Sequence, residues 1–438
     1  MMTSNAEQGV IGAYAALGVE MNILLNSTFT DEVKKAEFYN AATTHEWQYS
    51  PADITIRDNF TAMAPNYIIA DRVNRVLVAL PTSDSTKAGD IALKSKVKGE
   101  ALFLRAYAHF ELFRYYSANY DPAGLAMPYM ETPSLEPQAR IKMDAYFTKL
   151  NADLVEAKTL VPNNLTDINR ATRTAVSALQ ARVALYTKDW ANAVTYSTEY
   201  INALPLATRA EFPGIWTDAN TKEVGLRLIR TSTTGGRIGS LFRGTSSGPA
   251  AIGTITWMPS NKLWDSYDQT NDIRFSSYLK DEPLLTGGRP TRIIQKYAGT
   301  TYGTTGENLA NAKVFRTGEM YLIRAEARAE LGMVTGANSA ESDLNTLRAA
   351  RISGYTNETF ASKDAVITAI IQERFKELPF EGHRFFDLKR RALPIDRLAT
   401  DAPTPIGTTL PAGNFRFLLP IPTVELQRNE LLVQNPGY

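Results

Sequence analysis

The 438-residue sequence contains no cysteine and only three histidines, His45, His109 and His383. Without cysteine the chain cannot form disulfides, bind metals through thiolates or use a thiol nucleophile. The absence of cysteine gives no information about whether the protein lies in an oxidising or a reducing compartment. No second histidine follows His45-Glu46 at zinc-site spacing, and His109 lies among aromatic residues on a predicted helix, which favours a core position. We therefore expect no zinc site and no cofactor, while a structural Ca²⁺ held by oxygen ligands stays open.

The chain also lacks an excess of either charge, with 47 basic and 46 acidic residues and a formal net charge of +1. No global field therefore favours nucleic acid or an anionic membrane. No apolar run approaches the roughly 20 residues of a membrane helix, and the polar start MMTSNAEQG does not resemble a signal peptide. We expect a soluble chain, in which a removed export or anchoring segment would leave no trace.

Motifs of nucleotide binding and serine hydrolysis are missing from the predicted elements. The stretch TTGGRIGSLFRG has neither the dinucleotide fingerprint nor the Gly-Lys-Ser/Thr end of a phosphate loop. A nucleophile elbow would need Gly-x-Ser-x-Gly after a strand, an arrangement that the sequence does not predict. Paired-carboxylate glycosidase chemistry stays open, because 46 acidic residues allow many spatial pairs.

Apolar residues repeat with helical spacing through most of the chain. A capping-box spacing at Ser4-Asn5-Ala6-Glu7 opens a run of apolar residues that continues to Leu24, which predicts one amphipathic helix. Further runs predict helices around 69–80, 97–115 and 147–160, with Pro65 at the start or a kink of the first of these.

Two pairs of shorter helices follow, rich in small residues. Ala175 to Tyr186 and Trp190 to Ile201 are separated by a three-residue break, and a second, degenerate pair is formed by EMYLIRAEARAELG and ESDLNTLRAARISG. Such pairs must stack to bury their apolar faces, as in tetratricopeptide-like arrays. The sequence therefore predicts an all-α fold with tetratricopeptide-like helix pairs.

The composition changes between residues 205 and 311, where Gly, Thr and Ser rise and helical periodicity fades. Short alternating pieces such as VGLRLIR predict a few strands among long loops, where binding surfaces usually lie. We expect one unit over 1–438. Its parts would be a helical scaffold over 1–204 and 312–391, a loop-rich, minor-β ligand-binding region over 205–311 and an extended C-terminal segment over 392–438.

The run ERFKELPFEGHRFFDLKRR, from Glu373 to Arg391, combines acids, bases and a histidine as a catalytic site would. It continues a helix predicted over 362 to about 379, with Ser362 as its cap. Its charges fall at three-residue steps, which predicts these local pairs: Glu373 with Lys376, Arg374 with Glu377, Glu381 with Arg384 and Asp387 with Arg390. Mutually neutralising pairs around Phe380, Phe385 and Phe386 favour a structural ion network over catalysis.

Segments along nearly the whole chain resemble the SusD/RagB family, surface lipoproteins that work with TonB-dependent transporters in Bacteroidetes nutrient uptake. The resemblance lies in GAYAAL, GEALFLRAYAHFELFRYY, ADLVEAKTLVP, YLIRAEARAELG with LNTLRAAR, ERFKELPFEGHRFFDLKR and LLPIPTVELQRNELLVQNPGY. Two departures are the Trp often found after the Asp-Leu of the fifth segment, replaced here by Arg391 or Ala392, and the lipidated N-terminal Cys, which is absent.

The resemblance implies a tetratricopeptide-like scaffold without catalytic activity that captures a glycan, and sometimes a peptide, at the cell surface. It further implies delivery into a SusC-like barrel in the outer membrane, with attachment through a lipid anchor that this sequence does not contain. Binding would then replace chemistry.

Sugar recognition needs aromatic rings for stacking and polar groups for the hydroxyls. The tryptophans in or beside loops are the first candidates, together with one tyrosine and one arginine as a polar partner: Trp47, Tyr49, Trp216, Arg243, Trp257 and Trp264. Trp264 lies in a segment similar to a structural part of the family, which favours packing for it, and Trp190 follows a helix turn, which favours the core.

Two alternatives to a glycan-binding protein stay open. One is a tetratricopeptide-like scaffold that binds a peptide or only docks on the transporter. The other is a glycoside hydrolase on a helical scaffold, for which sugar release would depend on a single Glu or Asp.

Overall fold

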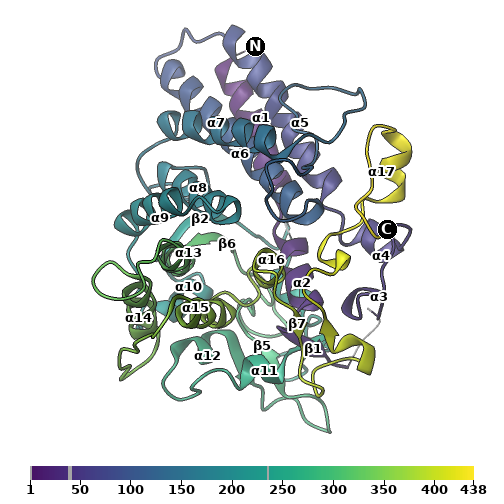
Figure 1. Cartoon of the computed structure of the whole chain (residues 1–438), viewed down its shortest axis with the longest axis vertical. Helices are drawn as coiled ribbons and strands as arrows, with labels where there is room; N and C mark the ends of the chain where they lie inside the picture. Colours follow the sequence, from purple (N-terminus) through teal and green to yellow (C-terminus); the bar gives the residue numbers. More distant parts are fainter. Residues whose placement is uncertain (1, 38–41, 234–235) are drawn as a thin grey trace. The chain divides into compact units, whose positions relative to one another are not determined.

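The structure is a computed structural model that describes residues 2–37, 42–233 and 236–438 (Figure 1). The chain forms two compact units, and each is assembled from segments far apart in the sequence. Unit 1 comprises residues 1–18, 49–192 and 415–438. Unit 2 comprises residues 19–48 and 193–414.

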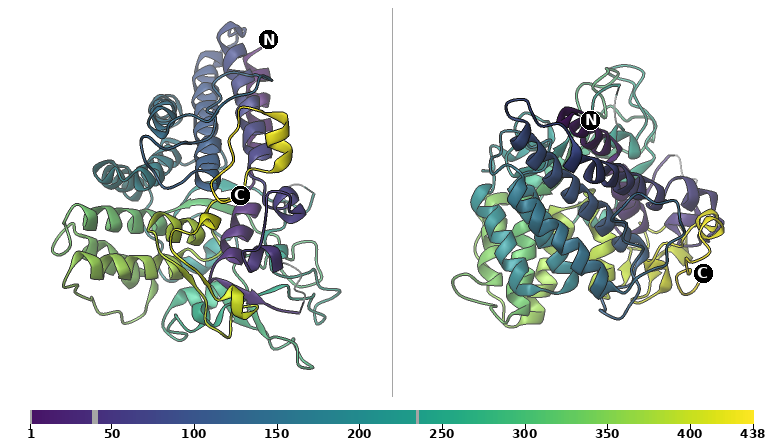
Figure 2. Two further views of the ribbon diagram at one scale, coloured as in Figure 1. Left: turned by 45° about the vertical axis from the view of Figure 1, so that its right-hand side comes forward. Right: turned by 90° about the horizontal axis from the view of Figure 1, so that it is seen from above.

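Unit 1 is a stack of helices around α6 (Asp90–Tyr116). Helix α6 packs against α1 (Thr3–Ala16), α5 (Met63–Ala79), α7 (Met143–Leu160) and α8 (Arg173–Thr187), and Figures 1 and 2 show α1, α5 and α6 side by side. Every residue of α6 from Gly99 to Tyr116 is buried, as expected for a helix enclosed by others. The short elements of unit 1 are α4 (Ile54–Asp58), η1 (Leu80–Thr82), η4 (Phe415–Phe417) and α17 (Thr423–Arg428).

Unit 2 has a helical core of α13 (Thr317–Glu330), α14 (Ala340–Arg351) and α15 (Lys363–Glu377). Leu322, Ala325, Leu344, Leu347 and Ile370 interlock between them, and alanines let the helices approach closely. The Ser339 capping box starts α14, and the Ser362 hydroxyl accepts from the Ala365 amide to start α15 as predicted.

The remaining helices of unit 2 are short, and α16 (Arg384–Arg390) packs on α2 (Glu20–Phe29). Helix α9 (Trp190–Ala203) begins at the end of unit 1 and continues into unit 2. The others are α3 (Ala42–His45), α10 (Phe212–Trp216), α11 (Asn261–Trp264), α12 (Ile273–Tyr278), η2 (Ile238–Leu241) and η3 (Pro405–Gly407).

The strands of the described residues form four small antiparallel pairs, all in unit 2. They are β1 (Val33–Lys35) with β3 (Trp257–Pro259), β2 (Val224–Leu228) with β6 (Ala312–Arg316), β4 (Leu279–Asp281) with β5 (Arg292–Ile294) and β7 (Ile395–Asp396) with β8 (Thr409–Leu410). The predicted all-α, tetratricopeptide-like class with minor β structure is confirmed.

The predicted N-terminal helix is two helices rather than one. Leu17 has an extended backbone and ends α1, and α2 begins again after Val19. The Ser4 capping box is also absent, because α1 starts two residues earlier than a Ser4 cap requires, at Thr3 with Met2 as N-cap, and has no side-chain cap. The apolar residues keep their spacing of three and four residues from α1 into α2. The spacing alone therefore does not reveal the break between the two helices.

The same segment corrects the expectation that no apolar run approaches the length of a membrane helix. By length and composition alone, Thr3–Phe29 is long and apolar enough to cross a membrane, with a mean hydropathy of 1.3. In α2, however, Asn26, Ser27 and Thr28 are buried and hydrogen-bonded within the protein, as in a core helix.

The charged run after Glu373 forms a buried ion network in unit 2, which agrees with the structural interpretation. Its partners differ from the predicted local pairs, because the network joins distant segments. Glu377 accepts from Arg274, Arg316 and Arg351 at 3.0–3.3 Å. Five carboxylates and five cations make up its centre: Asp272, Glu223, Glu373, Glu377 and Glu381 with Arg274, Lys296, Arg316, Arg348 and Arg351.

Of the four predicted local pairs, Asp387 with Arg390 is present at 2.8 Å. Arg374 pairs with Asp387 instead of Glu377, and Arg384 binds both carboxylate oxygens of Asp31 at 2.8 Å. The charged residues at this buried helix end contact several distant segments. Their spacing in the sequence therefore does not predict their ion-pair partners.

Replacing Glu377 tests the network. Glu377→Gln removes one of the carboxylates that each of three buried arginines contacts, and we expect a loss of about 3–5 kcal/mol in the free energy of unfolding by urea denaturation. The matched control is Glu156→Gln, which breaks an exposed pair with Lys98 and should change stability by less than about 0.5 kcal/mol. Equal effects of the two variants would contradict the network's role.

Glu32 gives the stability a specific pH dependence. Its carboxylate accepts from the Phe380 amide and the Ser27 hydroxyl, and burial raises the pKa of Glu32 to about 7. Burial also opposes ionisation of Asp31, but Arg384 and Lys262 hold the pKa of Asp31 well below its usual range.

Because the pKa of Glu32 is raised, the folded protein binds this proton more tightly than the unfolded chain, so its stabilising effect is lost as pH rises through 7. The stability of Glu32→Gln relative to the natural protein should therefore rise by roughly 2–3 kcal/mol between about pH 5 and 8. Denaturation curves at both pH values check this, and a pH-independent difference would refute it.

Candidate functional site

A depression of about 400 Å³ lies in unit 2 between α10, α12 and the loop that follows β5. We call it the loop depression. Hydroxyl side chains, one amide, one lysine and two aromatic rings line it, and none of the described lining residues has a carboxylate: Pro213, Trp216, Thr217, Ser276, Ser277, Lys280, Gln295, Ala298, Gly299, Thr300, Thr301 and Tyr302. This composition suits an uncharged, hydroxyl-rich ligand.

Trp216 forms the buried side of the loop depression. Tyr278 meets its ring edge-on at 5.2 Å, and the ammonium of Lys296 lies 4.2 Å from the ring centroid. The indole N–H of Trp216 is buried and has no hydrogen-bond partner among the described residues. An unpaired buried donor costs about 1–3 kcal/mol.

Tyr302 forms the other aromatic side and is half-buried. Its ring packs against the apolar cluster of Ile252, Leu285 and Ile293, and the guanidinium of Arg243 lies 4.8 Å from its centroid. The Tyr302 hydroxyl donates to Glu282 at 2.6 Å; burial and the Glu282 carboxylate raise the pKa of Tyr302 above its usual range. The ring is therefore held in one orientation.

Glu307 ties together two loops of this region. Its carboxylate accepts from Arg243 and the Ser246 hydroxyl, both at 2.7 Å, and from the Gly303 amide at 2.7 Å. Although burial opposes ionisation, these donors lower the pKa of Glu307. At Gly303 (φ +70°), a Cβ atom would lie 2.6 Å from the Gly248 backbone, so the close approach of the loops requires glycine.

A second, more open depression of about 540 Å³ lies along the 245–254 loop. Arg289 crosses it, donating to the carbonyls of Ile252 and Gly253 at 2.9–3.0 Å and to both carboxylate oxygens of Glu37. Thr245, Ser247 and Thr254 supply hydroxyls to its lining. Both depressions therefore lie within the loop-rich region, apart from Glu37.

The six residues predicted to bind a ligand are all buried, between 1% and 5% exposed. Trp216 lines the loop depression, and the other five have protein partners. The Trp47 indole donates to the Phe29 carbonyl at 2.8 Å beneath Arg397, and the Tyr49 hydroxyl donates to the Arg416 carbonyl.

Trp257 and Trp264 lie equally deep in unit 2. Trp257 meets His45 edge-on at 4.9 Å. Trp264 is packed between Phe275 and Arg292, which agrees with the packing preferred for it. Trp190 is half-buried, whereas the sequence pattern favoured the core. A role of the six residues in ligand contact stays a prediction.

Tyr302 and its neighbours were not among the residues predicted from the sequence, because the loop tryptophans were the first candidates for stacking. The signal was available in TTYGTTG, residues 300–306, where hydroxyl residues and glycines surround an aromatic residue between predicted strands. Such a composition is typical of an ordered binding loop.

Ser246 stands in a Gly-x-Ser-x-Gly spacing, at Gly244 to Gly248, but has no nucleophile geometry. It follows a 3₁₀ helix and a loop rather than a strand, and its hydroxyl donates to Glu307 instead of a histidine. Among the residues that the structure describes, no group of three or more His, Asp or Glu could hold a metal ion.

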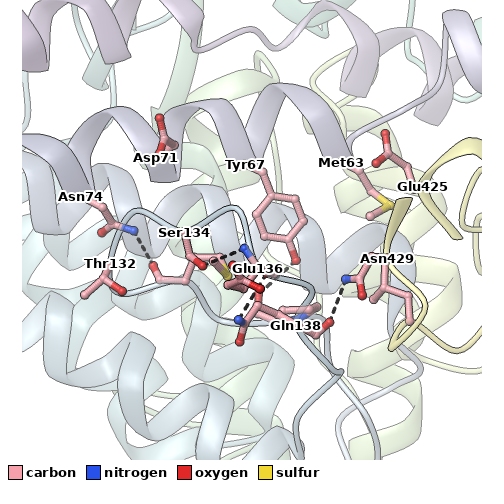
Figure 3. Close-up of a pocket in the computed structure, with 13 residues that line it drawn as sticks. Met63, Tyr67, Asp71, Asn74, Thr132, Ser134, Glu136, Gln138, Glu425 and Asn429 are labelled. Atoms are coloured by element: carbon pink, nitrogen blue, oxygen red, sulfur yellow. Dashed lines mark hydrogen bonds between the residues drawn. The ribbon is translucent and has the colours of Figure 1, made fainter. Parts of the chain in front are cut away.

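A third concavity, of about 200 Å³, lies within unit 1 and is shown in Figure 3. We call it the unit 1 groove. One wall is α5 with Met63, Tyr67, Asp71 and Asn74, and the others are the 128–138 segment and the C-terminal Glu425, Asn429 and Leu432.

The 128–138 wall of the groove is fixed by side chains. Asn74 donates to the Met130 carbonyl and Asn429 to the Gln138 carbonyl, at 2.8 and 2.9 Å. The Met130 amide donates to Nε2 of His109 at 2.9 Å, and burial lowers the pKa of His109 to about 3, so this ring is a neutral acceptor at physiological pH.

These features define a helical protein whose concave sites are equipped for binding. Residues 229–438 match a sequence model of the SusD family, and residues 2–185 match one described as "Starch-binding associating with outer membrane". The chain belongs to the SusD/RagB family.

Three proteins similar to this chain are a curated SusD-like protein and two solved structures. SusD-like protein P2 of Formosa agariphila is 27% identical over 420 residues, which cover 85% of this chain and 79% of that protein. A SusD superfamily protein of Bacteroides vulgatus has 22% identity and a TM-score of 0.84, with 100% and 99% of the two chains covered. A laminarin-binding SusD-like protein has 22% identity and a TM-score of 0.77, with 99% of each chain covered.

Removing the Glu307 carboxylate should loosen the loops. Glu307→Ala leaves Arg243 buried without its partner, and we expect a loss of about 3–5 kcal/mol in stability. Amide exchange measured by mass spectrometry should become faster in residues 243–254 and 299–307. Asp281→Asn, at an exposed carboxylate, is the control, and unchanged exchange in both loops would refute the account.

Proposed function

We propose that the protein is a non-enzymatic glycan-binding protein of the cell surface. It captures oligosaccharides and delivers them to a SusC-like TonB-dependent transporter in the outer membrane. The observation that carries the proposal is the loop depression, with two aromatic rings, many hydroxyl and amide groups and an unpartnered indole N–H. The protein's membership of the SusD/RagB family and the fold that it shares with a laminarin-binding protein support the proposal.

Each part of the depression has a task in sugar binding. The Tyr302 ring stacks on the C–H face of a sugar ring, while Thr300, Thr301 and Gln295 exchange hydrogen bonds with its hydroxyls. The indole N–H of Trp216 donates to a sugar oxygen that reaches the buried side. Stacking fixes the ring plane and the polar groups select the hydroxyl pattern.

Binding without hydrolysis fits the lining of the loop depression. Glycoside hydrolysis needs two carboxyl groups flanking the bond, about 5–9.5 Å apart. The described residues that line the loop depression include none, and nearby Glu282 is engaged by Lys280 and Tyr302. A bound sugar would therefore meet no general acid.

We assign ligand binding to the loop-rich region over 205–311, with residues 1–204 and 312–391 as scaffold and 392–438 as an extended C-terminal segment. Of the six predicted side chains, Trp216 contacts the glycan. Trp47, Tyr49, Arg243, Trp257 and Trp264 hold the surrounding structure. The outer-membrane association in one matching family description supports a surface location, which a lipid anchor would provide.

Tyr302 tests the site because it is only half-buried. We expect Tyr302→Ala to weaken oligosaccharide binding about tenfold, in keeping with the value of an aromatic contact, and Tyr302→Phe to keep most of it. Titration calorimetry against a panel of laminarin, starch and other oligosaccharides measures both. Because Trp47 and Trp257 are buried, their alanine variants would also lower the melting temperature, so they are poorer probes.

Two results would count against the proposal. Full affinity in Tyr302→Ala would remove the loop depression as the binding site. If the natural protein bound none of the oligosaccharides in the panel, the proposal of glycan binding itself would be refuted.

A further inference from the structure

The unit 1 groove combines an apolar floor with an acidic rim (Figure 3). Met63, Tyr67, Met130 and Leu432 supply the floor. Tyr67 is fixed by its hydroxyl, which donates to the Pro128 carbonyl at 3.0 Å. Such a floor accepts a large apolar side chain, because methionine side chains adapt to irregular shapes.

The rim of the groove is acidic. Asp71, Glu136 and Glu425 line the groove, and none of the described residues that line it is a lysine or arginine. Asp71 pairs with Arg75 at 2.8 Å on the exposed side of α5, whereas Glu136 and Glu425 form no ion pair among the described residues. The complementary ligand is therefore cationic as well as apolar.

Exposed aliphatic residues continue the apolar character beside the groove. Leu135 is 99% exposed and stands between two lining residues of the 128–138 wall. Leu431 and Val433, 48% and 62% exposed, flank the lining residue Leu432. Exposed apolar residues gathered around one concavity are a feature of protein contact sites.

Size and rigidity narrow the choice of occupant. At about 200 Å³ the groove is smaller than the roughly 300 Å³ from which small-molecule pockets range upward, but it accommodates one large side chain. Its wall is already fixed by the bonds of Asn74, His109 and Asn429, so little ordering is needed on binding.

We propose that the unit 1 groove docks an extended peptide segment of a partner protein. One large apolar side chain of the segment enters the groove, and a lysine or arginine on either side of it pairs with Glu136 and Glu425. This site is separate from the loop depression and does not depend on glycan binding.

Fluorescence anisotropy tests the proposal with a labelled, blocked peptide, Gly-Arg-Ser-Leu-Ser-Arg-Gly, and the full chain. We expect saturable binding that weakens with ionic strength, as for partly exposed ion pairs. Two matched peptides, one with both arginines replaced by glutamate and one with leucine replaced by serine, should bind at least tenfold more weakly.

Protein variants locate the binding. Glu136→Gln combined with Glu425→Gln should weaken binding of the arginine peptide about fivefold, the effect of one exposed and one half-buried charge. Glu430→Gln removes an exposed carboxylate from the same C-terminal segment outside the groove and should change nothing. Melting temperatures of all variants show whether they are folded.

Three results would overturn the proposal. They are equal binding of the glutamate peptide, unchanged affinity in the double variant, and no saturable binding of any peptide at millimolar concentration. Displacement of the peptide by laminarin oligosaccharides would also overturn it, because the groove would then be a sugar site.

Discussion

The contact of one carboxylate, Glu377, with three arginines organises unit 2. The arginines come from α12, β6 and α14, while Glu377 ends α15, so a single group joins four elements. Burial opposes the ionisation of Glu377, but Arg351, Arg316 and Arg274 hold the pKa of Glu377 far below its usual range. Removing any of these charges therefore leaves its buried partners with fewer opposite charges.

The ion network contacts the loop depression through Trp216, which lines it. The guanidinium of Arg316 and the ammonium of Lys296, both in the network, lie 5.0 and 4.2 Å from the centroid of the Trp216 ring. Lys296 also donates to the Pro379 carbonyl and to Glu381, and burial lowers the pKa of Lys296 to about 8. Buried ion pairs add little net stability compared with apolar packing, but they fix geometry strictly. A preformed site loses less entropy when it binds a flexible oligosaccharide.

The helical scaffold was accessible from the sequence because helix periodicity and caps are local signals. The predicted runs correspond to α5, α6, α7, α8, α9, α13, α14 and α15, and Ser362 caps its helix as expected. The break between α1 and α2 was missed, since the apolar repeat continues across Leu17. The charged run was correctly interpreted as structural, but its partners lie up to 353 residues away, as for Arg384 with Asp31.

The candidate site was less predictable, for the same physical reason. Whether a tryptophan faces solvent or is covered by a distant arginine depends on tertiary contacts, as with Arg397 on Trp47 and Arg292 on Trp264. Composition predicts the loop-rich region over 205–311, and its role in ligand binding stays a prediction. Which of its aromatic residues line a depression follows only from the way Glu307 joins its loops.

Hydrogen–deuterium exchange of the protein with and without a bound oligosaccharide, followed by analysis of the sugar, tests the central claim most directly. The account predicts slower exchange in residues 276–280 and 295–302, unchanged slow exchange in α14 and α15, and an oligosaccharide recovered intact. Protection confined to other segments would contradict the assignment of the site. Shortened oligosaccharide chains would contradict the claim that this protein binds without cleaving.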